Sequence, residues 1–342
     1  MITGSRLQAG TAAIATVASA PGMAAASTRR ILVFDAMGEM RLNYSRDLIR
    51  EIIDSGLNAI TVTLTDPKAY EQQAYEEAKA AVADHDAFIA DHPDLFIKAT
   101  SIADLDRAKR QNKIAVYYLF QNSAQFGRDL ARVKEFYDAG VRSSQITYNH
   151  QNWAGSGCKE PRGSGLTRFG GELIDYMNEL GMLIDLSHAN DETTLDSIAA
   201  SKKPLVVSHT CCMSVYRNER NISDGALRAL AGKGGVVGVC QIRPFITDKR
   251  PDKALPDYFA HIDHAVKIAG VEHVAIGSDR DHRVIVMTDE YLEEISREEG
   301  ENFNIADWPL FIDELNGPRR MEVVWDGLRK RGYGARDAEK IM

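Results

Sequence analysis

The sequence predicts one (β/α)8 barrel that follows a short leader. Short apolar runs rich in β-branched residues occur eight times along the chain, and stretches with helical periodicity separate them. A chain of 342 residues, of which 44% are hydrophobic, is also long enough to bury the core of one large α/β domain. We therefore expect the barrel to extend over residues 29–342 and the leader over residues 1–28.

The leader differs in composition from the rest of the chain. Residues 9–26 are mostly Ala, Gly, Thr, Val and Ser, and they end in three alanines. This composition is typical of the apolar part of a signal peptide that ends in an A-x-A cleavage site. We expect an exported, periplasmic protein whose mature chain begins near Ser27. The alternative is a disordered leader on a cytoplasmic protein.

The eight apolar runs have the length and composition of buried parallel strands. They are residues 31–34, 59–64, 114–120, 144–147, 183–186, 205–207, 236–239 and 274–276.

Helical periodicity is clearest between these runs. Residues 44–54 and 169–180 each place four large apolar side chains on one face and stop at a glycine, as helices commonly do. Residues 191–201 are predicted to form the helix that returns the chain between the fifth and sixth strands. The insertion 66–94 is rich in Ala, Glu and Gln and is expected to form a helix on the outside of the barrel. The acidic segment 283–311 is interpreted as solvated surface, with a lid or an oligomer contact as alternatives.

Composition excludes several classes of function. The net charge of −8 and the lack of a Lys/Arg-rich block argue against a nucleic-acid partner. No segment after the leader has the ~20 apolar residues that a membrane-spanning helix needs. The four cysteines form no C-x-x-C pair, which argues against a zinc ribbon or a thioredoxin-like site. A small-molecule substrate is the remaining expectation.

Two histidines follow neighbouring predicted strands. His188 comes after residues 183–186 and His209 after residues 205–207. Neighbouring strands lie about 5 Å apart, so two imidazoles at matching strand ends can share one metal ion. Asp279 follows the last strand, where a carboxylate can either ligate the metal or exchange protons with a bound water. These residues predict a metal site at the carboxyl ends of the strands, where barrels carry their catalytic groups.

Other polar residues follow the remaining strands. Glu39 comes after the first, Gln121 after the third, and Tyr148 and His150 after the fourth. Arg220, followed by Asn221, is the best candidate to grip a substrate carboxylate, because a guanidinium can form two parallel hydrogen bonds with it.

Several segments resemble the membrane dipeptidase (renal dipeptidase-like) family of zinc hydrolases. They are residues 165–170 (GLTRFG), residues 177–188 (MNELGMLIDLSH), Ser208 and His209, Arg220 and Asn221, and residues 277–279 (GSD). The resemblance extends from about Ile31 to the end of the chain. It implies a (β/α)8 metallohydrolase of the amidohydrolase superfamily that cleaves dipeptides, typically as a homodimer with two zinc ions. It further implies that His188 and His209 bind one zinc, that Arg220 grips the substrate carboxylate and that Asp279 moves protons.

The chain departs from the family pattern at the first metal site. Family members usually have His-x-Asp after the first strand and a zinc-bridging Glu after the third, where this chain has Met37-Gly38-Glu39 and Gln121. A thioether is a poor zinc ligand in such a site, and a neutral amide cannot offset the charge of two dications. Glu39 remains a candidate for weak binding. Tyr148 replaces a substrate-binding His, although His150 lies two residues later.

We therefore expect a hydrolase with one Zn²⁺ per chain, held by His188 and His209 with Asp279 or Gln121 as third ligand. It would cleave an amide bond in a small, carboxylate-bearing, dipeptide-like substrate. Asp279 would exchange protons, Arg220 and Asn221 would bind the substrate, and Tyr148 or His150 would polarise the scissile carbonyl. The alternative hypotheses are a non-hydrolytic binding protein, a lyase or isomerase that keeps the barrel, and a barrel without activity.

Overall fold

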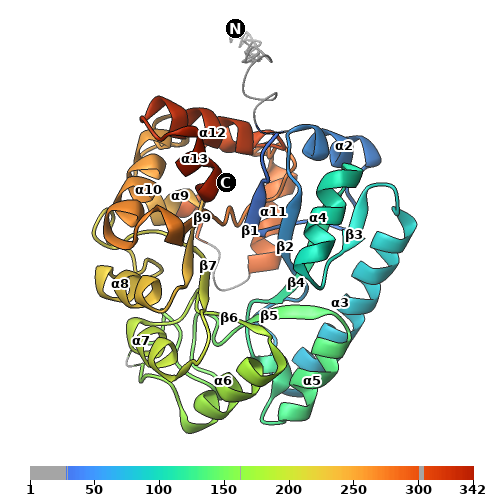
Figure 1. Ribbon diagram of the computed structural model, residues 1–342, viewed down its shortest axis with the longest axis vertical. Coiled ribbons are helices and arrows are strands. Elements are labelled where there is room, and N and C mark those ends of the chain that lie inside the picture. The colour runs from blue at the N-terminus through green and yellow to red at the C-terminus, as the bar shows by residue number, and fades with distance from the viewer. Residues whose placement is uncertain (1–27, 29, 162, 300–303) are drawn as a thin grey trace, which may run out of the picture.

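Parallel strands form a barrel that helices surround, as Figure 1 shows for the computed structural model. The structure describes residues 28, 30–161, 163–299 and 304–342. Within these residues the strand order is β1-β2-β4-β5-β6-β7-β8-β9, and each neighbouring pair is parallel. The strands are β1 (Phe34–Gly38), β2 (Ala59–Thr63), β4 (Ile114–Phe120), β5 (Val141–Gln145), β6 (Leu183–Asp185), β7 (Val206–Thr210), β8 (Val236–Val239) and β9 (Val274–Ile276). The predicted (β/α)8 fold is confirmed.

Backbone and side-chain hydrogen bonds join the last strand to the first. The N–H of Asp279 donates to the carbonyl of Met37, with 2.8 Å between nitrogen and oxygen. The N–H of Glu39 donates to the carbonyl of Arg280 at 3.1 Å. These bonds place the segments that follow β1 and β9 side by side at the carboxyl end of the barrel.

Most of the helices lie outside the strands (Figure 1). Their bounds are α2 (Arg46–Asp54), α3 (Glu71–Asp91), α4 (Ile102–Gln111), α5 (Leu130–Asp138), α6 (Arg168–Leu180), α7 (Asp191–Ala200), α8 (Asp224–Gly232), α9 (Arg243–Ile246), α10 (Leu255–Ala269), α11 (Asp289–Glu299), α12 (Arg320–Lys330) and α13 (Ala335–Ile341).

Side-chain caps determine where several of these helices begin. Thr167 accepts a hydrogen bond from the third residue of α6, and Asn190 and Ser223 do the same for α7 and α8. Gly181 ends α6 with φ of 81°, a left-handed conformation that suits glycine. The helices predicted over residues 44–54, 169–180 and 191–201 are thereby confirmed to within two residues at each end.

A ninth strand, β3 (Phe96–Lys98), was not predicted. It pairs with residues 114–116 at the start of β4, whereas β5 pairs with residues 118–120 at the end of the same strand. The strand has only three residues, too few for an alternating pattern to stand out.

Three predicted strands are displaced along the chain. The first was expected at 31–34 but occupies Phe34–Gly38, because the carboxylate of Asp35 is satisfied inside the sheet by the N–H and hydroxyl of Ser278. The fourth was expected at 144–147 and starts three residues earlier, at Val141. The sixth was expected at 205–207 and ends at Thr210, so His209 lies within β7 rather than after it.

The insertion and the acidic segment both have defined positions. Helix α3 lies at the periphery of the molecule, as expected for the insertion 66–94 (Figure 1). The segment 283–311 is not simply solvated surface, because Tyr291, Asp307 and Leu310 line the central cavity described below. The predicted leader lies outside the described residues, apart from Thr28.

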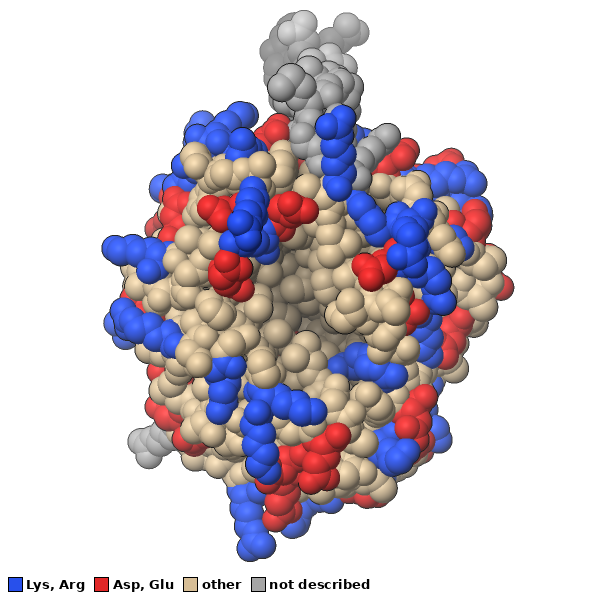
Figure 2. All heavy atoms as spheres, in the orientation of Figure 1, with Lys and Arg blue, Asp and Glu red and all other residues tan. Residues whose placement is uncertain are grey.

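The surface carries charges of both signs. On the face shown in Figure 2, basic and acidic side chains alternate around a hollow, and no large area has a single sign. That face offers no extended basic surface of the kind that binds nucleic acid. In the described part of the chain, no helix has the length and apolar composition required to span a membrane.

Candidate active site at the carboxyl ends of the strands

A cavity of about 900 Å³ opens at the carboxyl ends of the barrel strands. Most of the predicted site residues line it, which agrees with their expected positions at strand ends. These are Glu39, Gln121, Tyr148, His188, Arg220 and Asp279. His209 is fully buried in contact with His188.

His188 and His209 meet through their Nε2 atoms, which lie 3.0 Å apart. The Nδ1 of His188 donates to Oδ1 of Asn149 at 2.8 Å, because a carbonyl oxygen can only accept. His188 therefore carries its proton on Nδ1, and its Nε2 presents a lone pair to His209.

His209 has the same tautomer for a different reason. Its Nδ1 lies 2.8 Å from the hydroxyl of Ser208. That hydroxyl donates its one hydrogen to Oδ2 of Asp185 at 2.5 Å, so it accepts from the imidazole. Asp185 also accepts hydrogen bonds from Ser187. The network presents the Nε2 lone pair of His209 toward His188.

Both imidazole rings are held in the neutral form. Burial lowers the pKa of both imidazoles well below the usual value, and the charge of Arg220 lowers both further. Two neutral rings with facing lone pairs repel each other unless a cation lies between them. In a tetrahedral zinc site with Zn–N bonds of 2.0–2.1 Å, two ligand nitrogens are about 3.3 Å apart. The observed 3.0 Å is close to that separation, so the pair suits a single divalent cation.

A third ligand of the expected kind does not join the histidines. Within the residues that the structure describes, no group of three His, Cys, Asp or Glu side chains is positioned to hold a metal. The role of Asp279 as a third ligand therefore stays a prediction. Gln121, the other candidate, borders the same cavity.

Asp279 and Arg220 face the cavity beside the histidine pair. Burial raises the pKa of Asp279 to about 7, although the charge of Arg220 acts in the opposite direction. Arg220 is 5% exposed; its Nη2 donates to the carbonyl of His209, and its Nε has no hydrogen-bond partner among the described residues. A carboxyl group that titrates near neutrality and an incompletely paired guanidinium are thus placed at one cavity.

Tyr148 covers one face of His188. The centroids of the two rings are 4.2 Å apart, with 31° between the ring planes. The tyrosine lines the cavity, as predicted for a residue that contacts substrate.

The positions expected to hold a first metal have other contacts. The carboxylate of Glu39 forms an ion pair with Arg41, with 2.8 Å between Nη2 and Oε2. Met37 is completely buried and does not line the cavity. Gln121 contributes a neutral amide. These residues do not fit a second zinc ion beside the histidine pair.

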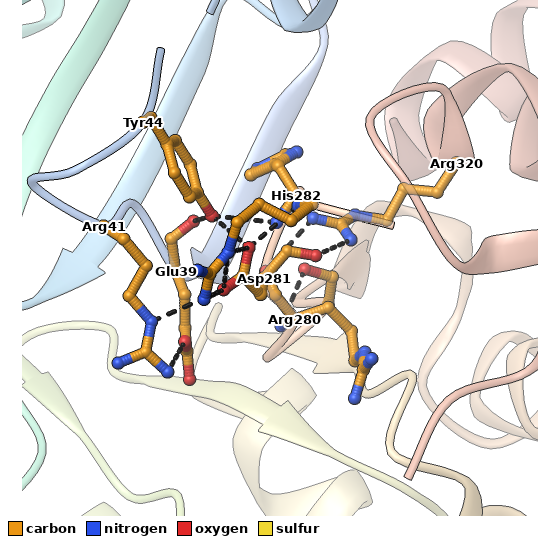
Figure 3. Close-up of polar contacts among 9 residues, drawn as sticks. Glu39, Arg41, Tyr44, Arg280, Asp281, His282 and Arg320 are labelled. Atoms are coloured by element: carbon orange, nitrogen blue, oxygen red, sulfur yellow. Dashed lines mark hydrogen bonds and ion pairs between the residues drawn. The ribbon is translucent and has the colours of Figure 1, made fainter. Parts of the chain in front are cut away.

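A polar cluster follows β9 next to Glu39 (Figure 3). The carboxylate of Asp281 accepts hydrogen bonds from Tyr44, at 2.6 Å, and from Arg283. Burial opposes ionisation of Asp281, but these hydrogen bonds hold its pKa at about 2. Arg320 donates to the carbonyls of residues 280 and 281, which fixes the backbone of this segment.

Two predicted site residues are placed elsewhere. His150 is exposed and does not line the cavity. Asn221 is buried outside the cavity lining, and its amide donates to the carbonyls of Tyr216 and Phe245. The substrate contacts expected of these two residues stay predictions, and the amide of Asn221 joins its own loop to α9.

Sequence reasoning missed three residues that shape the site. Asn149 and Asp185 fix the tautomers of the histidines, and Arg280 lines the cavity next to Asp279. The sequence held a signal for Asp185, because it is a charged residue in an otherwise apolar strand and a buried charge must be paired. Asn149 and Arg280 had no such signal.

Comparisons with known proteins agree with the earlier resemblance. Residues 34–298 match the model of the membrane dipeptidase family, peptidase family M19. A relative described as an uncharacterized protein in the pqqA 5′ region of Klebsiella pneumoniae is 37% identical over 245 residues, which are 68% of this chain and 84% of the relative. An uncharacterized dipeptidase from Schizosaccharomyces pombe is 36% identical over 178 residues. That match covers 51% of this chain but only 43% of the yeast protein.

Solved structures give the same fold. An amidohydrolase from Pseudomonas aeruginosa superimposes with a TM-score of 0.83 at 28% identity, over 93% of this chain and 95% of its own. A metallopeptidase from Rhodobacter sphaeroides, solved with a phosphinate mimic of the dipeptide L-Ala-D-Ala, has a TM-score of 0.75 at 18% identity, over 91% of this chain and 96% of its own. At that low identity the second likeness concerns the fold alone.

Proposed function

Because this chain belongs to the membrane dipeptidase family, peptidase family M19, we propose that it is a metal-dependent hydrolase that cleaves an amide bond in a small, dipeptide-like substrate. The observation that carries the proposal is the pair of Nε2 lone pairs on His188 and His209, 3.0 Å apart beside a cavity of about 900 Å³. Neutral imidazoles in this arrangement have little use other than binding a cation.

His188 and His209 would hold one zinc ion, with the amide oxygen of Gln121 as a neutral third ligand. A zinc ion bound there would lower the pKa of a water molecule to about 7 and polarise the scissile carbonyl. Asn149, Ser208 and Asp185 keep both rings in the required tautomer, which is the usual role of the groups behind metal ligands.

Arg220 would orient the substrate through its carboxylate. Its guanidinium is nearly buried and keeps a donor without a partner, so a bound carboxylate would satisfy it through charge-assisted hydrogen bonds. Holding one end of the substrate in this way places the amide bond near the histidine pair.

Asp279 would accept a proton during attack on the amide and return it to the leaving amine. A pKa near 7 suits a group that must both accept and donate at neutral pH. Tyr148, which lies on His188, would donate from its hydroxyl to the carbonyl oxygen as negative charge develops there.

The segments that line the mouth of the cavity would restrict water. Tyr291 and Ile295 of α11 and residues 306–308 border the cavity from the side of the acidic segment. Their position suits a wall that encloses a small substrate.

Turnover of a mixed library of dipeptides and N-acyl amino acids by the zinc-loaded protein tests the proposal. We expect cleavage by the unmodified chain and losses of at least about 100-fold for His188→Ala and Asp279→Asn. No cleavage by the zinc-loaded protein would contradict the proposal and favour a non-hydrolytic function of the same barrel.

A further inference from the structure

Arg280 is a second buried arginine of the cavity, and the proposed mechanism does not use it. It follows Asp279 after β9, is 5% exposed and lines the cavity. Its Nη2 is buried without a hydrogen-bond partner among the described residues. Figure 3 shows the guanidinium pointing away from Arg320 and from the carboxylate of Asp281.

The backbone of Arg280 is fixed, although Nη2 of its guanidinium has no acceptor among the described residues. Its carbonyl accepts hydrogen bonds from Nη2 of Arg320 and from the N–H of Glu39, both at 3.1 Å. Its guanidinium lies 5.9 Å from the centre of the Phe311 ring. The side chain is therefore presented from an anchored backbone and supported by an aromatic wall.

Other arginines that line the cavity already have acceptors. Arg243 donates to the carbonyls of Pro309, Lys249 and Asp307. Arg283 donates to Asp281, and Arg41 forms the ion pair with Glu39.

Burial of an unengaged guanidinium is unfavourable, because arginine stays charged inside proteins. Glu39 is the acid whose charge favours ionised Arg280 most, and its carboxylate is already paired with Arg41. An anionic group of a bound molecule would supply the missing acceptor.

We propose that Arg280 binds a second carboxylate of the substrate. The inference rests on the proposed function for the identity of the reaction, and it narrows the substrates to dipeptide-like molecules with two carboxylates. One carboxylate contacts Arg220 and the other contacts Arg280, with Asp279 facing the cavity beside both arginines. The planar guanidinium selects a carboxylate over its uncharged amide through paired, charge-assisted hydrogen bonds.

Binding of an unreactive pair of ligands tests Arg280 apart from catalysis. The probes are glutarate and its monoamide, which have nearly the same shape, titrated by calorimetry into the full chain with and without zinc. We expect the unmodified chain to bind glutarate about 10- to 100-fold more tightly, and Arg280→Met to remove this preference. Equal affinity for the two ligands, or a preference that survives in Arg280→Met, would overturn the proposal. A third outcome would also overturn the proposal: the chain binds inorganic phosphate but not glutarate, and Arg280→Met abolishes the binding of phosphate. Arg280 would then belong to a phosphate site.

Turnover supplies the second measurement. Dipeptides that contain Asp or Glu should have a kcat/KM about 10- to 100-fold higher than the same dipeptides with Asn or Gln. Arg280→Met should lower kcat/KM only for the dipeptides that contain Asp or Glu. Arg280→Lys keeps the charge and should retain part of the preference, which separates recognition from misfolding. Arg217→Met is the matched control, because Arg217 is exposed in the loop before Arg220 and lies outside the cavity lining. A glutarate preference without any amide cleavage would refute the proposed function and leave the assignment of Arg280 standing.

Discussion

Arg41 contacts the carboxylate of Glu39, with 2.8 Å between Nη2 and Oε2. The pair lies directly after β1, where the family resemblance leads one to expect a carboxylate that binds a metal. The guanidinium supplies a positive charge at that place. Since Met37 is buried away from the cavity and Gln121 is neutral, we propose that an ion pair takes the place of one of the two metal sites of the family pattern.

The first prediction is therefore that the chain binds about one zinc ion. Elemental analysis after mild purification and dialysis against zinc should give close to one equivalent per chain. His209→Ala should reduce the content toward zero, because it removes one of the two nitrogen ligands. Two equivalents in the unmodified chain would contradict the assignment of Glu39 to Arg41.

The second prediction concerns the hydroxyl that orients His209. Ser208→Ala removes the acceptor of Nδ1–H and the link to Asp185, so the ring loses its fixed tautomer. We expect zinc affinity to fall about 10- to 100-fold in a competition titration with a chelator. Ser197→Ala is the matched control, because the Ser197 hydroxyl is also buried but has no hydrogen-bond partner in the described chain. An unchanged affinity in Ser208→Ala would show that the network does not orient the ligand.

The third prediction follows from the raised pKa of Asp279, about 7. The folded chain holds this proton more tightly than the unfolded chain, whose carboxyl titrates near 3.8. The contribution of Asp279 to the stability of the metal-free protein should therefore decrease as the pH rises from about 4 to 7, and stay low above that. Asp279→Asn removes the titration and should stabilise the metal-free protein by about 1–3 kcal/mol at pH 8, with a smaller gain at pH 4. Urea unfolding at the two pH values measures the difference. A gain that is independent of pH would contradict the role of ionisation.

The parts of the site that the sequence predicted are those fixed by strand ends. His188, Arg220 and Asp279 line one cavity because each follows a barrel strand, and the sheet brings the carboxyl ends of its strands together. The strand runs were readable because buried parallel strands are continuously apolar. β1 was misplaced for the same reason, since its buried Asp35 interrupts the apolar pattern and depends on Ser278, 243 residues away.

Contacts between distant loops were not predictable. The ion pair of Arg41 with Glu39 is local, but the rotamers that form it depend on Asp281, which contacts Arg41 from the other end of the chain. The positions of Asn221 and His150 outside the cavity lining were not predictable, because proximity in sequence to a site residue does not determine which way a loop side chain turns. Arg280 was passed over because an arginine in a loop is ordinarily solvated.

The fourth prediction uses a histidine away from the metal site. His282 is 1% exposed, borders a small apolar pocket beside Tyr44, Ile60 and Phe96, and neither ring nitrogen has a hydrogen-bond partner among the described residues. Burial lowers its pKa well below the usual value of about 6.5, and the charge of Arg320 lowers it further. The unfolded chain therefore binds a proton that the folded chain does not, so His282 makes stability fall as the pH falls below 6.5.

His282→Phe removes this contribution of His282 to the pH dependence. The free energy of unfolding of the variant should therefore fall less between pH 6.5 and 5.5 than that of the unmodified chain, by up to about 1.4 kcal/mol. Urea unfolding of the metal-free proteins measures the difference, with the exposed His150→Gln as control. If His282→Phe and the unmodified chain lose the same free energy of unfolding between pH 6.5 and 5.5, the imidazole already carries its proton inside the pocket.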